Sequence, residues 1–444
     1  MAAQDLVKRA EQDGVQFVSL QFTDVLGATK AVNIPTSQLE NALEYGVWFD
    51  GSSILGFARI HESDMYLRLD ASTYAVLPWT SEERRRARII CDVYGPGGNP
   101  FAGDPRSALR RAVARAEEMG YTYQVGPELE FFLFRKDGEY PTKPVPHDVG
   151  GYFDFSPKDE AQSVRGDIIR ALEDMGIPVE ASHHEVATGQ HEIDFEYADA
   201  LTAADHAVTF KYAVKAVAAS YNLYATFMPK PIFGINGSGM HTHQSLRGTD
   251  GNNAFHDAGD EYHLSQTAYR FIAGQLAHAK ALAAIVAPTV NSYKRLTPGY
   301  EAPVYICWAQ INRSALIRIP RVSPNKPGST RVELRFPDPS TNPYLAFATM
   351  LMAGLDGVER SMEPPAPVNE DVYLFTHEDL EARGIDQLPG TLGDALDALE
   401  GDEVVKAALG DHLCEAYLRV KRAEWDEYRI QVSQWELDRY LETL

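Results

Sequence analysis

Several short stretches of the chain alternate charged and apolar side chains, and this pattern constrains the fold more than any other feature. In a β-strand, residues i and i+2 point to the same face. Glu128 and Glu130 therefore share one face of a predicted strand at 123–134, whereas Leu129 and Phe131 point to the other. Two carboxylates on one face repel each other, and burying them is costly unless cations neutralise them. This strand taken alone is more typical of a solvated sheet face.

The same alternation recurs in three further stretches, the first of which is made of two strand-like pieces. Glu185 and Glu192 lie in two strand-like pieces, at 179–186 and 190–197, which are joined through Gly189. Two more strands, at 239–246 and 330–336, carry His241, His243 and Ser245 in the first and Arg331, Glu333 and Arg335 in the second. A single histidine pair is more often structural than metal-binding. Glutamates and a histidine spread over four such stretches are much harder to explain as solvated surface.

The chemistry of these side chains narrows the choice of ion. Carboxylate-rich sites with an occasional imidazole and no thiolate suit Mg²⁺ or Mn²⁺ better than Zn²⁺. The candidate ligands are Glu128, Glu130, Glu185, Glu192, His241 and Glu333. They are too many for one catalytic ion that must keep positions for water and phosphate, so the sequence predicts two metals. Two hard cations beside arginines indicate phosphoryl transfer.

Arginines and one glycine-rich loop are candidate anion binders. A guanidinium group binds carboxylate or phosphate through two parallel hydrogen bonds. The alternative for each arginine is an ordinary ion pair with one of the 63 acidic residues. The loop at 236–239 (NGSG) favours the approach of backbone donors to a small anion. The chain has no GxxxxGK[ST] motif, so any ATP phosphates would be held by metals and arginines. The arginines are Arg295, Arg313, Arg318, Arg331 and Arg335.

Turn residues divide the chain into two predicted domains. Pro and Gly at 96–100 interrupt both the strand and the helix periodicity. Asp104 and Pro105 then predict the N-cap and the first residue of a helix. We therefore expect an N-terminal domain at 1–102 and a second domain at 103–444. The strand-like runs of the first domain are 15–22, 28–35 and 87–94, of which the first two read as a hairpin.

The second domain has strands separated by helices of uneven length, which favours an α+β fold over a regular βαβ array. The aromatic residues near the end of the chain, such as Trp425, Tyr428, Trp435 and Tyr440, are numerous for a tail. We expect the last 30 residues to form paired helices that pack against something, with another subunit as one candidate. The predicted helices lie at 160–175, 200–220, 262–286, 343–360 and 391–442.

Charge and cysteine content exclude several classes of function. The net charge of −22 (41 Lys and Arg against 63 Asp and Glu) disfavours binding to nucleic acid or to anionic lipid. Three widely spaced cysteines without a CxxC pair exclude a disulfide scaffold and a thiolate zinc site, and they fit a reducing cytoplasm. The polar N-terminus predicts no signal peptide, and the longest apolar run, 271–286, is too short and too polar for a membrane span.

Taken together and in order, nine motifs resemble those of bacterial and archaeal type I glutamine synthetases, over nearly the whole chain. They are FDGSS at 49–53, GPELE at 126–130, SHHEV at 182–186, GQHE at 189–192, FMPKP at 227–231, NGSGMH at 236–241, NSYKRLTPGYEAP at 291–303, NRS at 312–314 and RFPDP at 335–339. The resemblance implies ATP-dependent ligation of L-glutamate and ammonia to L-glutamine through a γ-glutamyl phosphate.

The resemblance also implies a role for each candidate residue. Glu130, Glu185 and Glu192 would hold one divalent metal, and Glu128, His241 and Glu333 the second. Asn236, Gly237, Arg295 and Arg335 would bind glutamate. Arg313 and Arg318 would stabilise the transferring phosphoryl group, with Arg313 also in contact with both substrates. Glu180, His243 and Ser245 would contact the nucleotide. Glu301, on a mobile flap, would close over the intermediate and help receive the ammonium proton.

The fold implied by the resemblance is a small β-grasp-like N-terminal domain plus a catalytic domain built on an open antiparallel β-barrel surrounded by helices. The assembly implied is a dodecamer of two stacked hexameric rings, locked together by the C-terminal helices. Asp50 and Ser53 would then reach the active site of the neighbouring subunit and form the ammonium site. A carboxylate there attracts NH₄⁺ and accepts its proton, which releases the nucleophile NH₃.

The chain departs from the family pattern at three places. Leu55 stands where the family usually has Glu, and Gly328 stands where some members carry an active-site Lys. The chain resembles the shorter subtype of the family. Tyr373 aligns with the tyrosine that the longer subtype adenylylates, but the residues around it depart from that motif, so we expect Tyr373 to have a structural role. Two alternatives remain open: a ligase of the same fold that joins glutamate to a polyamine or another amine, and a non-catalytic structural or regulatory member. The retained Asp50 and Ser53 favour ammonia.

Overall fold

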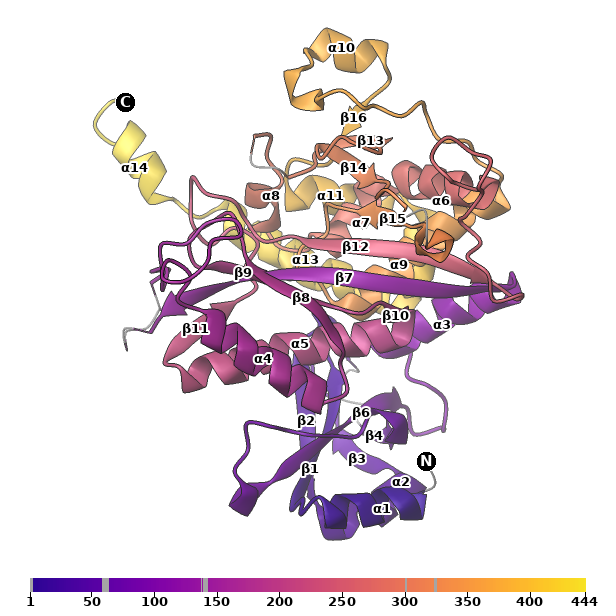
Figure 1. The fold of residues 1–444 in the computed structure, drawn as a ribbon, viewed down its shortest axis with the longest axis vertical. Coiled ribbons are helices and arrows are strands. Elements are labelled where there is room, and N and C mark those ends of the chain that lie inside the picture. Colours follow the sequence, from indigo (N-terminus) through magenta and orange to yellow (C-terminus); the bar gives the residue numbers. More distant parts are fainter. Residues whose placement is uncertain (1–2, 58–63, 137, 139–142, 300–301, 323–325) are drawn as a thin grey trace.

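The computed structural model describes residues 3–57, 64–136, 138, 143–299, 302–322 and 326–444. Two sheets organise these residues, a smaller one near the N-terminus and a larger one in the rest of the chain (Figure 1). The elements of the smaller part are α1 (Ala3–Gln12), β1 (Phe17–Thr23), β2 (Thr29–Pro35), α2 (Leu39–Tyr45), β3 (Val47–Asp50), β4 (Asp64–Leu69), β5 (Ala75–Val76) and β6 (Arg86–Tyr94).

The smaller sheet has the strand order β2-β1-β6-β4-β3, with β5 beside β6. The predicted hairpin is present, because β1 and β2 pair in antiparallel register. The central strands β1 and β6 run parallel to each other. Leu6 of α1 and Leu39 of α2 are buried in the same apolar cluster as Val18 and Leu20 of β1, so both helices pack on one face of the sheet. This arrangement agrees with the expected β-grasp-like domain.

The larger sheet has ten strands in the order β16-β13-β14-β15-β12-β7-β9-β8, with β10 and β11 also paired to β7. Every pair is antiparallel except β13 with β14. The expected open antiparallel sheet is therefore present, with one parallel pair. Its strands are β7 (Tyr121–Arg135), β8 (Val179–His184), β9 (Gln190–Phe195), β10 (Ala198–Asp199), β11 (Leu223–Thr226), β12 (Met240–Gly248), β13 (Tyr305–Ala309), β14 (Ala315–Arg318), β15 (Val332–Leu334) and β16 (Asp386–Gln387).

Helices surround the larger sheet, and polar caps define several of their first residues. Asp104 accepts hydrogen bonds from the backbone N–H groups of Arg106 and Ser107, and Pro105 follows it as the first helical residue, as predicted. The helices are α3 (Pro105–Glu118), α4 (Gln162–Asp174), α5 (Ala200–Ser220), α6 (Gln266–Ala277), α7 (Ala279–Val286), α8 (Ser292–Arg295), α9 (Pro343–Glu359), α10 (His377–Ala382), α11 (Leu392–Glu400), α12 (Glu403–Leu409), α13 (Asp411–Arg429) and α14 (Gln434–Tyr440). None of the helices among the described residues has both the length and the apolar character that a membrane span requires.

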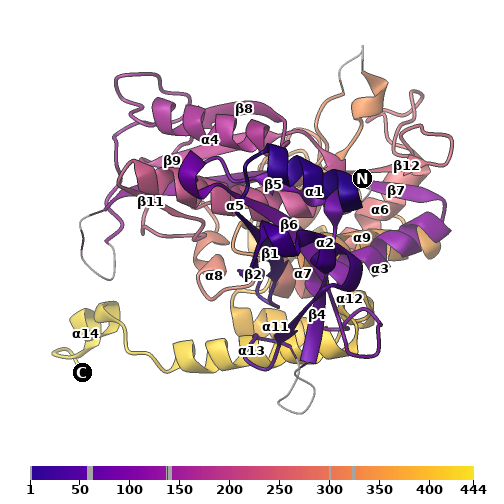
Figure 2. The same cartoon turned by 90° about the horizontal axis from the view of Figure 1, so that it is seen from below.

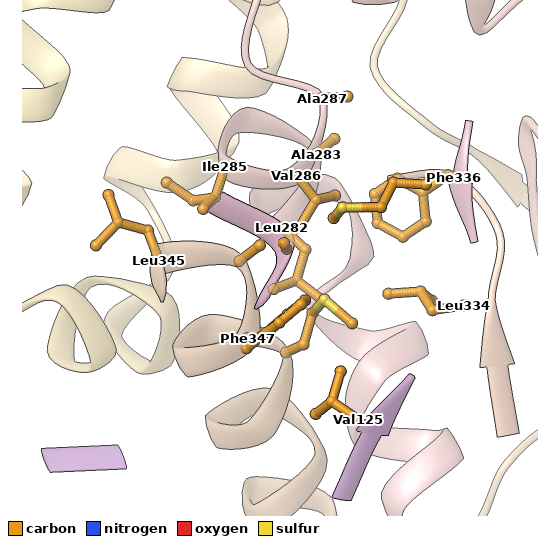
Figure 3. Close-up of a cluster of buried hydrophobic side chains, with 14 of the residues drawn as sticks. Val125, Leu282, Ala283, Ile285, Val286, Ala287, Leu334, Phe336, Leu345 and Phe347 are labelled. Carbon is orange, nitrogen blue, oxygen red and sulfur yellow. The ribbon is translucent and has the colours of Figure 1, made fainter. Parts of the chain in front are cut away.

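The apolar faces of the strands form the core, as the alternation predicted. Leu129 and Phe131 of β7 are fully buried, and the ring of Phe131 lies edge-on to Phe210 of α5. Around Leu282 of α7, side chains from β7, β15 and α9 meet, including Leu334 and Phe347 (Figure 3). The polar face of the same strands is thus held on a densely packed base.

Two predicted helices are divided in the structure. The stretch 262–286 forms α6 and α7, which meet at His278. The stretch 391–442 forms four helices, with breaks next to Gly401, Gly410 and Ile430. The predicted pairing of the last helices with each other is also wrong for the isolated chain, because α14 projects away from the body beyond the end of α13 (Figure 2).

Candidate active site

The register of the larger sheet brings the predicted metal ligands onto one face. Glu128 of β7 is directly opposite His241 of β12, and Glu130 of β7 is opposite Glu192 of β9. Glu333 of β15 is opposite His243 of β12 on one side and Arg318 of β14 on the other. Side chains that are far apart in sequence therefore become neighbours by strand pairing alone.

A cavity of about 300 Å³ lies over this face. All six predicted metal ligands line it, and so do the predicted glutamate and phosphoryl binders. The lining includes Glu128, Glu130, Glu185, Glu192, His241 and Glu333, together with Asn236, Gly237, Arg295, Arg313, Arg318 and Arg335. The structure therefore brings these residues together around one cavity.

Carboxylates from β7, β9 and the end of β8 crowd one side of the cavity. Ligand atoms of His183, Glu185 and Glu192 lie within 4.8 Å of one another, and His183 Nε2 is 2.8 Å from Glu185 Oε1. Glu130 faces the same cavity but is not a member of this closest group. Burial raises the pKa of Glu130 to about 8, and the negative charge of Glu185 adds to the effect. Burial, followed by the charge of Glu130, also raises the pKa of Glu192.

A second group lies on β7, β12 and β15. Ligand atoms of Glu128, His241 and Glu333 lie within 4.8 Å of one another. Burial opposes the ionisation of Glu128, but the nearby His243 and His241 outweigh it and hold the pKa of this carboxyl well below its usual range. Burial likewise opposes the ionisation of Glu333, and Arg335, His243 and His241 lower its pKa. Both carboxylates of this group are therefore ionised at neutral pH.

Arginines close the side of the cavity next to Glu333. Arg335 Nη1 donates to Glu333 Oε1 over 2.6 Å, and Arg318 Nε donates to the other carboxylate oxygen. Arg335 Nε is buried and has no acceptor among the described residues. Arg295 is buried and donates to the backbone carbonyls of Phe336 and Arg335. Arg313 lines the cavity from an exposed position. The arginines thus present donors to an anion in the cavity.

A second cavity, of about 670 Å³, adjoins the first and shares Glu128 and Asp194 with it. Three of the residues predicted to contact the nucleotide line this second cavity, namely Glu180, His243 and Ser245. His243 connects the two cavities, because its Nε2 lies 2.8 Å from Glu128 Oε1. A molecule that occupied both cavities would pass directly over Glu128.

Two predicted residues lie away from the cavities, and one lies outside the described residues. Asp50 ends β3 in the smaller sheet, where it is exposed and accepts a hydrogen bond from the backbone N–H of Ser52. Ser53 is exposed in the turn that follows. Neither residue lines the cavity of its own chain. Glu301 lies outside the described part of the chain.

Comparison with known proteins identifies the family. The model for the glutamine synthetase catalytic domain matches residues 102–440, and the model for the glutamine synthetase beta-Grasp domain matches residues 14–96. The chain belongs to the glutamine synthetase family. It is 56% identical to a glutamine synthetase of Halobacterium salinarum, over 97% of this chain and 95% of that protein. It is 53% identical to a glutamine synthetase of Thermus thermophilus, over 99% of this chain and 98% of that protein.

Solved structures that are similar to this chain have the same fold. A structure described as "GmaS/ADP complex-Conformation 1" superposes with a TM-score of 0.89 and 36% identity, and 99% of each chain is covered. The cryo-EM structure of a Plasmodium falciparum glutamine synthetase superposes with a TM-score of 0.88 at 27% identity, again over 99% of both chains. The sheet that carries the site is therefore the glutamine synthetase scaffold.

The residues of the cavity fit the divalent metals on which glutamine synthetases depend. The donors are carboxylate oxygens and an imidazole, which suit hard cations. Glu130 and Glu192 face each other across β7 and β9, and neither has an arginine or lysine partner among the described ion pairs. Burial raises the pKa of both carboxyls, and the repulsion of neighbouring negative charges adds to it, from Glu185 at Glu130 and from Glu130 at Glu192. A bound cation would remove the repulsion.

Three further polar residues of the cavity were not predicted: His183, Gln190 and Asp194. All three belong to strands whose ligands were predicted, and all three obey the two-residue periodicity. Gln190 and Asp194 are two positions on either side of Glu192, and His183 is two positions before Glu185. The signal was present in the sequence, because side chains two apart on a strand share a face.

Proposed function

We propose that this chain is a glutamate–ammonia ligase, which forms L-glutamine from L-glutamate, ammonia and ATP. The observation that carries this proposal is the side-by-side arrangement of an acidic metal-binding face and a set of arginines in one cavity, beside a second cavity that adjoins it. In the reaction, the γ-carboxylate of glutamate displaces ADP from the γ-phosphorus of ATP. Ammonia then attacks the carbonyl carbon of the γ-glutamyl phosphate, and inorganic phosphate leaves.

We propose that Glu130, Glu185 and Glu192 hold one divalent metal and that Glu128, His241 and Glu333 hold the second. Mg²⁺ and Mn²⁺ are the ions that fit oxygen donors with a single imidazole. When bound, such ions neutralise phosphate charge and make the phosphorus a better electrophile. The protein supplies the fixed positions of these ligands, because each one stands on a paired strand or in the turn that follows it.

The arginines and the loop at 236–239 would orient the two substrates. Arg335 Nε is buried in the cavity wall and has no acceptor within the part of the chain that the structure describes, which supports a contact with the glutamate carboxylates. Asn236, Gly237 and Arg295 line the same part of the cavity. Arg313 and Arg318 would stabilise the phosphoryl group as its charge redistributes between the leaving ADP and the attacking oxygen.

Nucleotide contacts are proposed for Glu180, His243 and Ser245, which line the second cavity. Arg331 supports the orientation of His243, since its Nε donates to His243 Nδ1 over 3.1 Å. An arginine can only donate, so His243 Nδ1 accepts this hydrogen bond, and His243 Nε2 faces Glu128. Lys326 and Gly328 both line this cavity, and Gly328 stands at the position where some members of the family carry an active-site lysine.

Asp50 and Ser53 would complete the site of a neighbouring subunit. Both are exposed on the smaller sheet and lie outside the cavity of their own chain, which is the arrangement that a shared site requires. There the Asp50 carboxylate would attract ammonium and accept its proton. Glu301 would help receive the proton after the attack of ammonia.

We further propose a dodecamer of two hexameric rings in the cytoplasm. Apolar side chains of the C-terminal segment are exposed in the single chain, which supports their burial between subunits. All three cysteines are free and buried, as expected in a reducing compartment. Tyr373 is proposed as a structural residue and not an adenylylation site, because its hydroxyl donates to the backbone carbonyl of Ala302 over 2.7 Å.

Steady-state phosphate release, with the product identified by mass spectrometry, tests the proposed function. The expected result is glutamine formation with ammonium and a much lower rate with methylamine, ethanolamine or putrescine. Activity confined to the amines would establish the alternative amine ligase, and no activity with any of these acceptors would favour the non-catalytic alternative.

The variant Glu333→Gln should lower kcat by about 100-fold or more, because it removes a charged ligand at the proposed ATP-side metal. Glu370→Gln is the matched control, since Glu370 is exposed and pairs with Arg383 at the surface. Equal activity of Glu333→Gln and the wild type would contradict the two-metal assignment.

A further inference from the structure

The buried side chain of Gln190 stands at a junction between three parts of the proposed active site. Gln190 begins β9 and is 1% exposed. Its side chain lies on the same face as Glu192, two residues further along the strand. It therefore points toward the carboxylates without being a metal ligand itself.

The side-chain amide of Gln190 contacts Glu130 on β7, the loop at 236–239 and the turn between β8 and β9. Its Nε2 lies 2.9 Å from Glu130 Oε2, 3.0 Å from the backbone carbonyl of Gly237 and 3.3 Å from Ser238 Oγ. Its Oε1 accepts a hydrogen bond from the backbone N–H of Ala187 over 3.3 Å. A primary amide has two N–H donors and a carbonyl acceptor, so all of its groups are engaged.

These contacts fix the orientation of the Glu130 carboxylate. Glu130 Oε2 accepts two hydrogen bonds, from Gln190 Nε2 and from the backbone N–H of Gly239. With Oε2 held in this way, Oε1 is the oxygen left to face a cation. Groups that hold a metal ligand by hydrogen bonding typically change metal affinity by about 10- to 100-fold when they are removed.

The same side chain fixes the loop that lines the glutamate end of the cavity. The Gly237 carbonyl accepts from Gln190, and the backbone N–H of Ser238 donates to the carbonyl of Pro229 over 2.8 Å. Asn236 and Gly237 on this loop line the cavity together with Glu130. A substitution of Gln190 would therefore alter the position of the Glu130 carboxylate and that of the loop at 236–239 at the same time.

We propose that Gln190 is a positioning residue that couples the metal-binding carboxylate of Glu130 to the substrate-binding loop at 236–239. The predicted effect on glutamate binding rests on the proposed function. The predicted effect on metal binding does not depend on which reaction the site performs. Gln190 does not line the second cavity, so the nucleotide contacts are outside its reach.

The test is the variant Gln190→Met, which keeps the length of the side chain and removes every hydrogen bond. We expect the Mn²⁺ concentration for half-saturation, measured by thermal shift and by calorimetry in the absence of substrates, to rise about 10-fold. We expect the KM for glutamate to rise several-fold, while the KM for ATP changes less than twofold. Gln190→Glu keeps the size and polarity of the side chain but loses the hydrogen-bond donors when it is ionised. It should shift the Mn²⁺ half-saturation and the glutamate KM in the same way, and it replaces Gln190→Met in the test if that variant does not fold.

Gln275→Met is the matched control. Gln275 is fully buried, and its amide also holds a side chain and a backbone carbonyl, Gln244 Oε1 at 2.6 Å and Met350 O at 3.0 Å. This variant should lose thermal stability but keep the wild-type Mn²⁺ and glutamate values. The proposal is overturned if folded Gln190 variants keep Mn²⁺ half-saturation and glutamate KM within twofold of the wild type, or if Gln275→Met shifts both equally. A wild type that makes no glutamine would refute the proposed function, and the Mn²⁺ measurements would still decide the coupling to Glu130.

Discussion

Gly237 and Gly239 allow the loop at 236–239 to pass against the Arg295 side chain. A Cβ atom on Gly239 would lie 2.6 Å from Arg295 Nη2 and 3.2 Å from His241 Nε2. A Cβ atom on Gly237 would lie 2.2 Å from the backbone carbonyl oxygen of Pro229. Real Cβ atoms do not approach backbone oxygens as closely as 2.2 Å, so a side chain at Gly237 must displace the loop, and one at Gly239 must displace the loop or the Arg295 guanidinium group.

The substitution Gly237→Ala should therefore lower kcat/KM for glutamate by about 10-fold or more, because the loop can no longer hold its position against Pro229 and Arg295. Steady-state kinetics with varied glutamate measures this effect. Gly166→Ala is the control, since Gly166 lies in α4, where a Cβ would meet nothing within 4 Å. That change should leave the kinetics unaltered and stabilise the protein by roughly 0.5–1 kcal/mol. Unchanged glutamate kinetics in Gly237→Ala would contradict the placement of this loop in the substrate site.

A buried histidine cluster behind β8 and β9 shows why proximity of potential ligands is not sufficient for a metal site. Ligand atoms of His147, Asp148 and His191 lie within 4.8 Å of one another. Arg165 Nη1, however, donates to His191 Nδ1 over 2.9 Å, so the proton of the neutral imidazole is on Nε2. Burial lowers the pKa of His191, in agreement with a neutral ring. A protonated ring nitrogen offers no lone pair to a metal, so this cluster acts as a hydrogen-bonded support.

The cluster also fixes the turn that carries Glu185. Both ring nitrogens of His184 face acceptors, the backbone carbonyl of Glu185 at 2.7 Å and Asp148 Oδ1 at 3.2 Å. Asp148 Oδ1 also accepts from the backbone N–H of Gly189. The ligand Glu185 therefore has its backbone held by an imidazole and a carboxylate that are both fully buried.

At the scale of the elements, the alternation of polar and apolar residues predicted the strands of the site and the face on which each side chain lies. The predicted strand at 123–134 is β7, and that at 239–246 is β12. The pairing of these strands could not be predicted from periodicity, because register depends on contacts between strands that are distant in sequence. The strands β13 and β14, which pair in parallel, were not predicted, because neither has an alternation of ionic and apolar residues.

The division of the predicted helix at 262–286 has a different cause. The stretch contains neither Pro nor Gly at the break, so the sequence carries no strong stop signal there. At the break, His278 Nδ1 lies 2.7 Å from Asp402 Oδ2 and His278 Nε2 lies 3.1 Å from Asp356 Oδ2. The imidazole thus joins the α6–α7 junction to α9 and to the N-cap of α12.

This contact predicts a pH dependence of stability. Burial acts to lower the pKa of His278, but the hydrogen bonds with Asp402 and Asp356 outweigh it and raise the pKa above 6.5. A raised pKa in the folded state means that the stabilisation is fully present below pH 6.5 and is lost as the pH rises through the higher folded value. His278→Gln should therefore lower the free energy of unfolding by roughly 1–2 kcal/mol at pH 6 and by less at pH 9.

Urea unfolding at several pH values measures this difference. The control is His377→Gln, because His377 and its partner Glu381 are both largely exposed and such pairs contribute little. A constant difference between wild type and His278→Gln over the whole pH range would show that the imidazole is not charged in the folded protein.

At the scale of the whole molecule, the buried side chain of Arg106 joins the smaller part to the larger part. Arg106 of α3 is 2% exposed and lies 2.8 Å from Asp70 and 2.7 Å from Asp92, both in the smaller part. It also lies 2.7 Å from Asp205 of α5 in the larger part. Three carboxylates around one guanidinium are stable only while the positive charge remains.

Arg106→Met should therefore destabilise the protein by about 3–5 kcal/mol and separate the unfolding of the two parts into distinct transitions. Denaturant unfolding followed by tryptophan fluorescence would detect both effects, since Trp48 and Trp79 belong to the smaller part and Trp308 to the larger. Arg110→Met is a close control, because Arg110 pairs with the same Asp70 and Asp92 but is 43% exposed. Arg110→Met should lower the free energy of unfolding by less than about 1 kcal/mol. A single transition with wild-type stability in Arg106→Met would contradict this role.

The C-terminal segment, residues 430–444, predicts how the proposed dodecamer would be held together. Its apolar side chains are exposed in the single chain, Ile430 by 73%, Trp435 by 60% and Leu441 by 73%, and α14 extends beyond the rest of the molecule (Figures 1 and 2). If this segment joins two rings, replacing Trp435 and Leu441 by Glu would place charges in an apolar interface and reduce the particle from roughly twelve to roughly six chain masses of 49.3 kDa. Mass photometry at nanomolar concentration measures the result. Leu374→Glu is the control, because Leu374 is 81% exposed in a different part of the surface and its replacement should leave the particle mass unchanged. An unchanged dodecamer in the double variant would mean that other surfaces hold the rings together.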